Sequence, residues 1–334
     1  MNVVLLDPGI SRDGDTNVNN LGDLIISEAV NSVVSDIVPE ENLFRISSHS
    51  KFKLDDLRRI LFADFVFLGG TNLLSSYFNK MNRPLGPNRM WHLIVPRLRN
   101  VVLLGVGWGY GYGEDVSPTA SRYYKRIFKK GTTHSVRDSY STQKLLSSGI
   151  NKVVNTNCPT LWTLNGTSMD LLVNKNSKKY SKCIFTLTDY GKDYGLDDQL
   201  LSMLGKEFRE LIFFPQGKWD AQYLKMLPSY SKLKDRIVIL ERSLKAYDSF
   251  VSTASDTLYI GTRLHGGIRC LQKNIKSLVV SIDNRAMDIS NDTGLAVVSR
   301  GDIKGIKKWI DGKSSYGDLR LDLIGIDSFL NQFK

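Results

Sequence analysis

Short apolar runs alternate with longer stretches of helical periodicity along the first half of the chain. Runs rich in Val, Ile, Leu and Phe predict strands at 3–6, 43–46, 65–68, 101–105, 134–137 and 152–155. The clearest helical stretches between them are 21–34, 54–61, 117–129 and 139–146. This alternation is typical of βαβ units and therefore predicts a parallel sheet covered by helices.

The second half repeats the pattern. Strands are predicted at 183–187, 211–214, 236–240, 257–261 and 277–282, and helices at 196–209, 221–227, 243–252, 266–273, 303–310 and near the carboxyl terminus. A polar segment rich in Asn, Ser and Lys separates the halves. We therefore predict an α/β protein with an amino-terminal Rossmann-like domain over 1–164, a linker over 165–182 and a second Rossmann-like domain over 183–334. Two doubly wound domains of this kind would face a central cleft.

Composition supports a globular protein, because 42% of the 334 residues are apolar and 24% are charged. No apolar run reaches the roughly 18 residues that a membrane span needs, and the amino terminus begins with a strand pattern in place of a signal peptide. We therefore expect a cytoplasmic location. The cysteines, Cys158, Cys183 and Cys270, lack metal-binding or disulfide-framework spacing, so we expect no metal site.

The net charge of +11 fits nucleic acid, an acidic membrane surface or small anionic substrates. Segment 122–130 carries basic residues interleaved with aromatic ones at helical spacing. This pattern predicts a solvated helix face, and peripheral contact with anionic lipid at the inner face of a membrane stays open as an alternative. We expect no nucleic-acid partner, because no recognised binding motif accompanies the charge.

Glycines cluster after two predicted strands, in Gly69-Gly70-Thr71-Asn72 and in Gly105-Val106-Gly107-Trp108-Gly109. Both segments are expected to be loops that approach a ligand. The GxGxxG pattern of dinucleotide sites is absent, so no nicotinamide cofactor is expected. Trp108, Tyr110 and Tyr112 could stack on sugar rings or pack against their own domain.

Two further motifs flank predicted elements. In Asn20-Leu21-Gly22-Asp23, Gly22 allows close backbone approach, and Asp23 either stabilises a helix start or orients an acceptor hydroxyl. In Ser135-Val136-Arg137-Asp138, Arg137 either forms a structural ion pair with Asp138 or binds a phosphate or carboxylate.

The segment 257–271 is the most informative. Gly261 allows a tight exit from a strand, and Gly266-Gly267 would begin a helix whose first amides can bind an anion. Arg263 adds a planar two-pronged donor, and His265 adds a side chain that exchanges protons near neutral pH. The chain has only four histidines, His49, His92, His134 and His265, and a purely structural role for the last of them stays open.

These motifs, in this order and at these intervals, resemble the polysaccharide pyruvyl transferase family over about residues 1–300. The resemblance implies a GT-B-like fold of two Rossmann-like domains, phosphoenolpyruvate as donor and a pair of sugar hydroxyls as acceptor. The products would be a pyruvate ketal and phosphate. It places the family's Arg and His on Arg263 and His265, and its mid-chain Arg on Arg137. The sequence departs from the family where Thr71 replaces a third glycine, and where Arg285 lies near a frequent lysine.

Phosphoenolpyruvate carries a carboxylate and a phosphate, which fixed cations bind best. We therefore expect Arg263 and His265 to be catalytic and Arg137 and Arg285 to bind substrate. The remaining expected substrate-binding positions are Gly22, Asp23, Gly69, Gly70, Gly266 and Gly267. No cofactor is expected besides the donor, and the sugar acceptor can be free or lipid-linked.

Two other functions stay open. A GT-B-type glycosyltransferase with a nucleotide-sugar donor would use a similar cleft. However, retaining enzymes of that type often carry a Glu-x7-Glu pattern in the second domain, and no glutamate follows Glu241. A non-catalytic sugar- or anion-binding protein would use the same glycines and arginines without turnover.

Overall fold

The computed structural model describes residues 1–10, 18–50, 52–77, 98–169 and 180–334. The chain forms two compact units. Unit 1 comprises Met1–Val18, Asp23–Trp162 and Leu321–Lys334, and unit 2 comprises Asn19–Gly22 and Thr163–Arg320. The carboxyl-terminal segment therefore returns to unit 1, although the sequence placed it in the second domain. Residues 170–179 of the predicted linker, and His92, lie outside the described residues.

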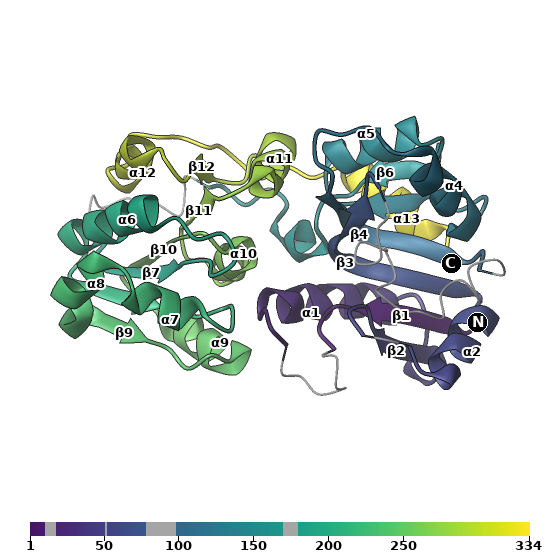
Figure 1. The fold of residues 1–334 in the computed structure, drawn as a ribbon, viewed down its shortest axis with the longest axis horizontal. Coiled ribbons are helices and arrows are strands. Elements are labelled where there is room, and N and C mark those ends of the chain that lie inside the picture. Colours follow the sequence, from purple (N-terminus) through teal and green to yellow (C-terminus); the bar gives the residue numbers. More distant parts are fainter. Residues whose placement is uncertain (11–17, 51, 78–97, 170–179) are drawn as a thin grey trace. The chain divides into compact units, whose positions relative to one another are not determined.

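Unit 1 is built on a parallel sheet with the strand order β2-β1-β3-β4-β5-β6. Its strands are β1 (Val3–Asp7), β2 (Leu43–Ser47), β3 (Phe65–Ser75), β4 (Val101–Tyr110), β5 (His134–Val136) and β6 (Val153–Asn155). Its helices are α1 (Gly22–Ser35), α2 (Leu54–Phe62), α4 (Pro118–Ile127), α5 (Ser139–Ser147) and α13 (Leu323–Asn331), labelled in Figure 1.

Both faces of this sheet are buried. Val4 and Leu6 of β1 join one apolar cluster, whereas Val3 and Leu5 join another that includes Phe329 of α13. Successive strand residues point to opposite faces, so a strand covered on both sides must be apolar at every position. This requirement explains the continuous apolar runs in the sequence.

Unit 2 contains a second parallel sheet, with the order β12-β11-β10-β7-β8-β9. Its strands are β7 (Lys182–Thr186), β8 (Glu210–Phe213), β9 (Ile237–Ile239), β10 (Thr257–Gly261), β11 (Ser277–Ser281) and β12 (Val297–Ser299). Its helices are α6 (Tyr194–Glu207), α7 (Asp220–Lys225), α8 (Pro228–Leu233), α9 (Leu244–Thr253), α10 (Leu264–Gln272), α11 (Asn284–Thr293) and α12 (Ile303–Ile310). The two sheets confirm the predicted class of two doubly wound α/β domains.

Every predicted strand and helix has a counterpart, but one strand and two α-helices of the described residues were not predicted. Strand β12 has only three residues and helix α8 only six, which leaves little periodicity to detect. Helix α11 is polar and rich in Asn and Asp, residues that usually favour turns. Helix α10 begins at Leu264, two residues before the predicted start.

The glycine-rich segments are strands and not the loops that the sequence suggested. Gly69 and Gly70 lie inside β3, whose pairing with β4 shifts register between Thr71 and Leu74. Gly70 has a φ of +32°, and a Cβ there would lie 2.4 Å from Cγ2 of Ile26 in α1. Close packing of α1 on the sheet therefore accounts for glycine at this position without a ligand.

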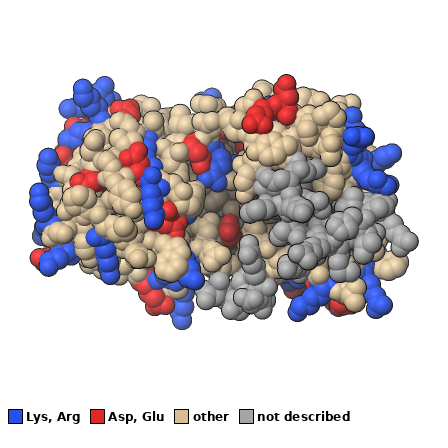
Figure 2. All heavy atoms as spheres, in the orientation of Figure 1, with Lys and Arg blue, Asp and Glu red and all other residues tan. Residues whose placement is uncertain are grey.

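The basic segment forms the predicted amphipathic helix. In α4 and the residues after it, Arg122, Lys125, Arg126 and Lys130 are exposed, whereas Tyr124 is buried. On the face shown in Figure 2, Lys and Arg side chains are spread widely and interrupted by Asp and Glu. No helix among the described residues is long and apolar enough to cross a membrane.

Two glycines with positive φ provide a matched test of the packing of α1. We expect Gly70→Ala to lower the free energy of unfolding by about 2–4 kcal/mol, because backbone strain adds to the clash with Ile26. Gly113 has a φ of +83° and open space around it. Gly113→Ala should therefore cost only about 1–2 kcal/mol. Urea unfolding of both variants checks this difference, and equal losses would contradict it.

Acid should destabilise unit 1 through His134. Its ring is buried beside Phe128, its Nδ1 accepts a bond from the Leu103 amide at 3.4 Å, and burial lowers its pKa to about 4. The pKa in the unfolded chain is about 6.5. The unfolded chain thus gains a proton first as pH falls, and up to about 3 kcal/mol of stability is lost between these two values.

Urea midpoints at pH 7.5 and 4.5 measure this loss. His134→Gln keeps an acceptor at the site but does not titrate, so its midpoint should fall less over the same interval. If parent and variant lose the same stability, His134 is not the group responsible.

Candidate active site

The end of strand β10 lies at the topological switch point of unit 2. The chain builds β8 and β9 on one side of β7 and then places β10 on the other side. Loops diverge at such a point, and ligands bind there in open α/β sheets. A hydrogen bond of 2.8 Å between the hydroxyls of Thr188 and Thr262 joins the loop after β7 to the loop after β10.

Arg263 is the N-terminal flanking residue of α10, and only 3% of its surface is exposed. Its Nε donates to Oδ2 of Asp220 at 3.1 Å, and its Nη2 donates to Oδ1 of Asp189 at 3.0 Å and to Oδ1 of Asp220. Burial lowers the pKa of the guanidinium, but the charge of Asp220 outweighs it and leaves the pKa raised. Arg263 is therefore a permanent cation already paired with two carboxylates.

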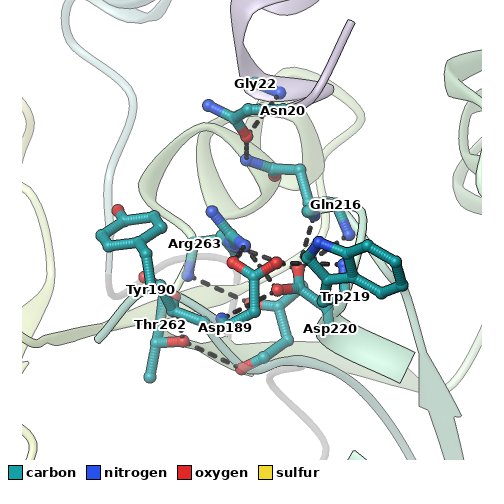
Figure 3. Close-up of polar contacts among 12 residues, drawn as sticks. Asn20, Gly22, Asp189, Tyr190, Gln216, Trp219, Asp220, Thr262 and Arg263 are labelled. Carbon is teal, nitrogen blue, oxygen red and sulfur yellow. Dashed lines mark hydrogen bonds and ion pairs between the residues drawn. The ribbon is translucent and has the colours of Figure 1, made fainter. Parts of the chain in front are cut away.

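Asp220 connects Arg263 to the loop after β8. This fully buried carboxylate accepts bonds from the amides of Asp189, Gln216 and Gly217 at 2.9, 3.1 and 2.6 Å. A Cβ on Gly217 would lie 2.1 Å from Nη2 of Arg263, so only glycine leaves room for the guanidinium. The ion pair thus fixes the loops after β7, β8 and β10 together (Figure 3).

This geometry changes the expectation for Arg263. The sequence suggested that its guanidinium holds the charge of the donor, but the buried side chain is neutralised from within the protein. A second anion would have to compete with Asp220 and Asp189 for the same N–H groups. The arrangement fits a positioning residue better than a direct ligand of the donor.

Arg285 is a more accessible guanidinium in unit 2. It pairs with Asp283 through a bond of 2.8 Å from Nε, and its side chain is 33% exposed. Its Nη2 donates to the hydroxyl of Tyr190 at 3.1 Å. The ring of Tyr190 also lies 5.0 Å from Cζ of Arg263, so one exposed tyrosine contacts both arginines.

The motif at residues 20–22 joins the same site. Oδ1 of Asn20 accepts bonds from the amide of Gly22 at 3.2 Å and from Nε2 of Gln216 at 3.0 Å. The Leu21 amide donates to the carbonyl of Gln216 at 3.0 Å. These contacts place Asn20 and Gly22 beside the Gln216 loop, as Figure 3 shows, whereas Asp23 belongs to unit 1.

The first turn of α10 carries His265 beside two buried glycines. His265 is partly exposed, directly after Arg263 and Leu264. A Cβ on Gly266 would lie 3.0 Å from Oε1 of Gln216, and one on Gly267 would lie 2.8 Å from the ring of Tyr259. Amides in the first turn of a helix have no carbonyl partner within that helix, so they are suited to bind anions.

The predicted site residues of unit 1 form separate clusters. Arg137 is 3% exposed, and its Nε pairs with Oδ2 of Asp138 at 3.3 Å. Asp138 also caps α5 by accepting a bond from the Ser141 amide at 2.7 Å. Trp108 is 2% exposed and bonded to Ser76, so it is a core residue and not a surface for a sugar ring.

Comparison with known proteins identifies the family. The model of the polysaccharide pyruvyl transferase family matches residues 20–284, which is more than half of the chain and includes the segment from Gly261 to His265. The chain belongs to the polysaccharide pyruvyl transferase family. It is therefore a member of a family of transferases. No functionally curated protein matches its sequence significantly.

Several solved structures resemble this member of the pyruvyl transferase family to different degrees. A UDP-GlcNAc 2-epimerase from Methanocaldococcus jannaschii superposes with a TM-score of 0.52 at 12% identity, covering 96% of this chain and 94% of that one. The UDP-N-acetylglucosamine 2-epimerase from Rickettsia bellii has a TM-score of 0.48 at 11% identity, covering 99% of this chain and 92% of that one. The E. coli heptosyltransferase WaaC has a TM-score of 0.39 at 8% identity, covering 94% of this chain and 100% of that one. The match with a TM-score above 0.5, together with the two doubly wound sheets, shows a GT-B-like fold.

Several residues of the site in this family member were not predicted from its sequence. Asp189, Tyr190, Asp220 and Arg242 all follow predicted strands of unit 2, so a search along the carboxyl ends of those strands would have found them. Burial lowers the pKa of Arg242, on which the charges of Asp220 and Arg263 also act. Among the described residues no group of side chains has the composition and spacing to hold a metal ion.

Replacing Arg263 should damage the scaffold of unit 2. Arg263→Ala leaves Asp220 buried without its counter-charge, so we expect a loss of about 3–5 kcal/mol in unfolding free energy. Arg263→Lys should recover only part of it, because lysine lacks the planar fork. Arg285→Lys alters a partly exposed pair and should cost under about 1 kcal/mol.

Urea unfolding measures these losses, and hydrogen exchange at the Gln216, Gly217 and Trp219 amides reports the loop directly. Full protection of these amides in Arg263→Lys would contradict the positioning role.

Proposed function

We propose that this protein transfers the pyruvyl group of phosphoenolpyruvate to two hydroxyls of a sugar, forming a pyruvate ketal and releasing phosphate. The observation that carries the proposal is the family match across an Arg263-Leu264-His265 segment that lies at the switch point of a doubly wound sheet. In our scheme the donor binds to unit 2 and the acceptor glycan binds largely to unit 1.

The donor is anionic at both ends, and two features of unit 2 suit it. The first turn of α10, including Gly266, offers amide donors and the positive end of a helix dipole, whereas the Gly267 amide already donates to the Arg263 carbonyl at 3.2 Å. Arg285 offers an accessible guanidinium whose geometry Asp283 and Tyr190 hold in place. Arg263 fixes the loops after β7, β8 and β10 and does not bind the donor directly. Arg137 of unit 1 is likewise buried and paired with the buried Asp138, so we propose that it supports substrate binding by positioning its loop and does not hold the anion directly.

Ketal formation needs one proton delivered and two removed. The first hydroxyl loses its proton and its oxygen bonds to C2 of the donor while C3 gains a proton; the second hydroxyl then loses its proton and its oxygen displaces phosphate from C2. Both steps are general acid–base chemistry. His265 is the proposed proton carrier, because it adjoins the first turn of α10 and its ordinary pKa lies near neutrality. The reaction uses no cofactor besides the donor substrate.

The acceptor is a glycan or glycan precursor. Acceptor contacts are proposed around Gly22 of unit 2 and around Asp23, Gly69 and Gly70 of unit 1, although packing already explains the two glycines of β3. A lipid-linked acceptor would suit the exposed basic face of α4, which can approach anionic headgroups. Sedimentation with anionic and neutral vesicles compares this contact directly.

Phosphate release from phosphoenolpyruvate in the presence of a sugar panel tests the reaction. We expect the parent to release phosphate only when an acceptor is present. His265→Ala should lower kcat by about 100- to 10,000-fold. Arg285→Ala should raise KM for phosphoenolpyruvate by about tenfold or more, because it removes a charged hydrogen-bond donor. Arg209→Ala, an exposed arginine elsewhere in unit 2, is the matched control.

Two outcomes would overturn the proposal. Consumption of a nucleotide sugar with no use of phosphoenolpyruvate would identify a glycosyltransferase. Binding of phosphoenolpyruvate with no turnover on any acceptor, and no effect of His265→Ala, would identify a binding protein.

A further inference from the structure

The indole of Trp219, like the ring of Tyr190, lies beside the candidate site and is directed to solvent. Trp219 is 56% exposed, whereas Trp108 and Trp309 are 2% and 1% exposed. It lies in the loop between β8 and α7, next to the buried Asp220. Exposing an indole forgoes the burial of a large apolar surface, and tryptophan is enriched at surfaces that bind other molecules.

The backbone of Trp219 is fixed although its ring is exposed. Its amide donates to Oδ2 of Asp189 at 3.0 Å, and its carbonyl accepts the Tyr223 amide at 2.9 Å. Oδ1 of the same Asp189 accepts Nη2 of Arg263. The carboxylate that helps to hold Arg263 therefore also holds Trp219, and Figure 3 shows the indole and Tyr190 flanking the Arg263–Asp220 pair.

The electrostatics of the ring favour a partner with positive polarisation. Nζ of Lys218 lies 5.2 Å from the ring centroid, in the range of a cation–π contact. The C–H groups on one face of a pyranose ring carry a partial positive charge and present a flat apolar surface. An indole can stack on such a face through its large area and its negative quadrupole.

Because the transferred group is small, the acceptor sugar must bind close to the donor. A pyruvyl group has only three carbon atoms, and reacting atoms must approach to about 3–3.5 Å. Both attacking hydroxyls must therefore reach C2 of the donor. If the donor binds at the start of α10, the reacting ring lies against unit 2 wherever the rest of the glycan binds.

We infer that Trp219 is a stacking platform for the acceptor pyranose ring that receives the pyruvyl group, and that Asp189 positions it relative to Arg263. This inference rests on the proposed function, because it assumes a sugar acceptor next to the donor site. It assigns the sugar contact to unit 2, in addition to any contacts in unit 1. Stacking supplies affinity for the ring, and so it acts on acceptor binding more than on the chemical step.

Steady-state phosphate release at saturating phosphoenolpyruvate tests the platform with methyl glycosides of galactose, glucose and mannose and with polymers of the same sugars. We expect Trp219→Ala to raise KM for the best acceptor about tenfold and to leave KM for phosphoenolpyruvate within about twofold. Trp219→Phe retains a stacking face and should recover most of the affinity. Phe62→Ala, which removes an 82% exposed ring from α2 of unit 1, should change neither KM.

Three kinetic results would overturn the inference. An unchanged KM for the acceptor in Trp219→Ala excludes stacking. An equal rise in both KM values, together with faster exchange at the Gly217 amide, indicates a structural role. A loss confined to the polymers, with the methyl glycosides unaffected, indicates a contact away from the reacting ring.

Mobility in native gels that contain the polymers separates this inference from the proposed reaction, since it needs no turnover. Retardation of the parent but not of Trp219→Ala supports the platform even if no phosphate is released. Equal retardation of both overturns the platform while the reaction can still stand. Absence of both retardation and turnover in the parent overturns both proposals.

Discussion

The buried ion pair between Arg263 and Asp220 is the interaction on which the architecture of unit 2 depends. Burying two charges is costly, and the cost is offset only when geometry is good and the remaining hydrogen-bonding groups are satisfied. Here the carboxylate also accepts three backbone amides, and the Arg263 carbonyl accepts the Tyr259 hydroxyl at 2.7 Å. One pair thereby fixes three loops at the carboxyl edge of the sheet.

Because Arg263 is paired with carboxylates of the protein, other groups of the site must bind the ligand. A guanidinium held by Asp220 and Asp189 provides rigidity but little net charge for a ligand. Anion binding then falls to groups without a buried counter-charge, such as the first turn of α10, and to Arg285 at the edge of the site. Separating the scaffold from the ligand contacts keeps the binding groups pre-organised, which lowers the ordering cost when a ligand binds.

The sequence predicts the elements of the fold well, because strands buried on both faces must be apolar throughout, as in Val3–Asp7. It also locates Arg263 and His265 correctly at a strand-to-helix junction. It could not reveal that Arg263 pairs with Asp189 and Asp220, since 74 and 43 residues separate the partners and only strand order brings them together. Glycines misled the prediction for a related reason. A glycine required by a crossing helix, as at Gly70, has the same local signature as one in a ligand loop.

The Asn20 motif shows how a short segment can belong to a distant site. Because the Gly22 amide can only donate, Oδ1 of Asn20 must be the acceptor, and Gln216 must therefore present its NH2 group to that same oxygen. This fixes the orientation of the Gln216 amide, so that Oε1 faces the start of α10, 3.0 Å from where a Cβ on Gly266 would lie. Gln216 is 2% exposed, and its Oε1 has no hydrogen-bond partner among the described residues. A residue near the amino terminus thus orients a buried amide group beside the first turn of α10.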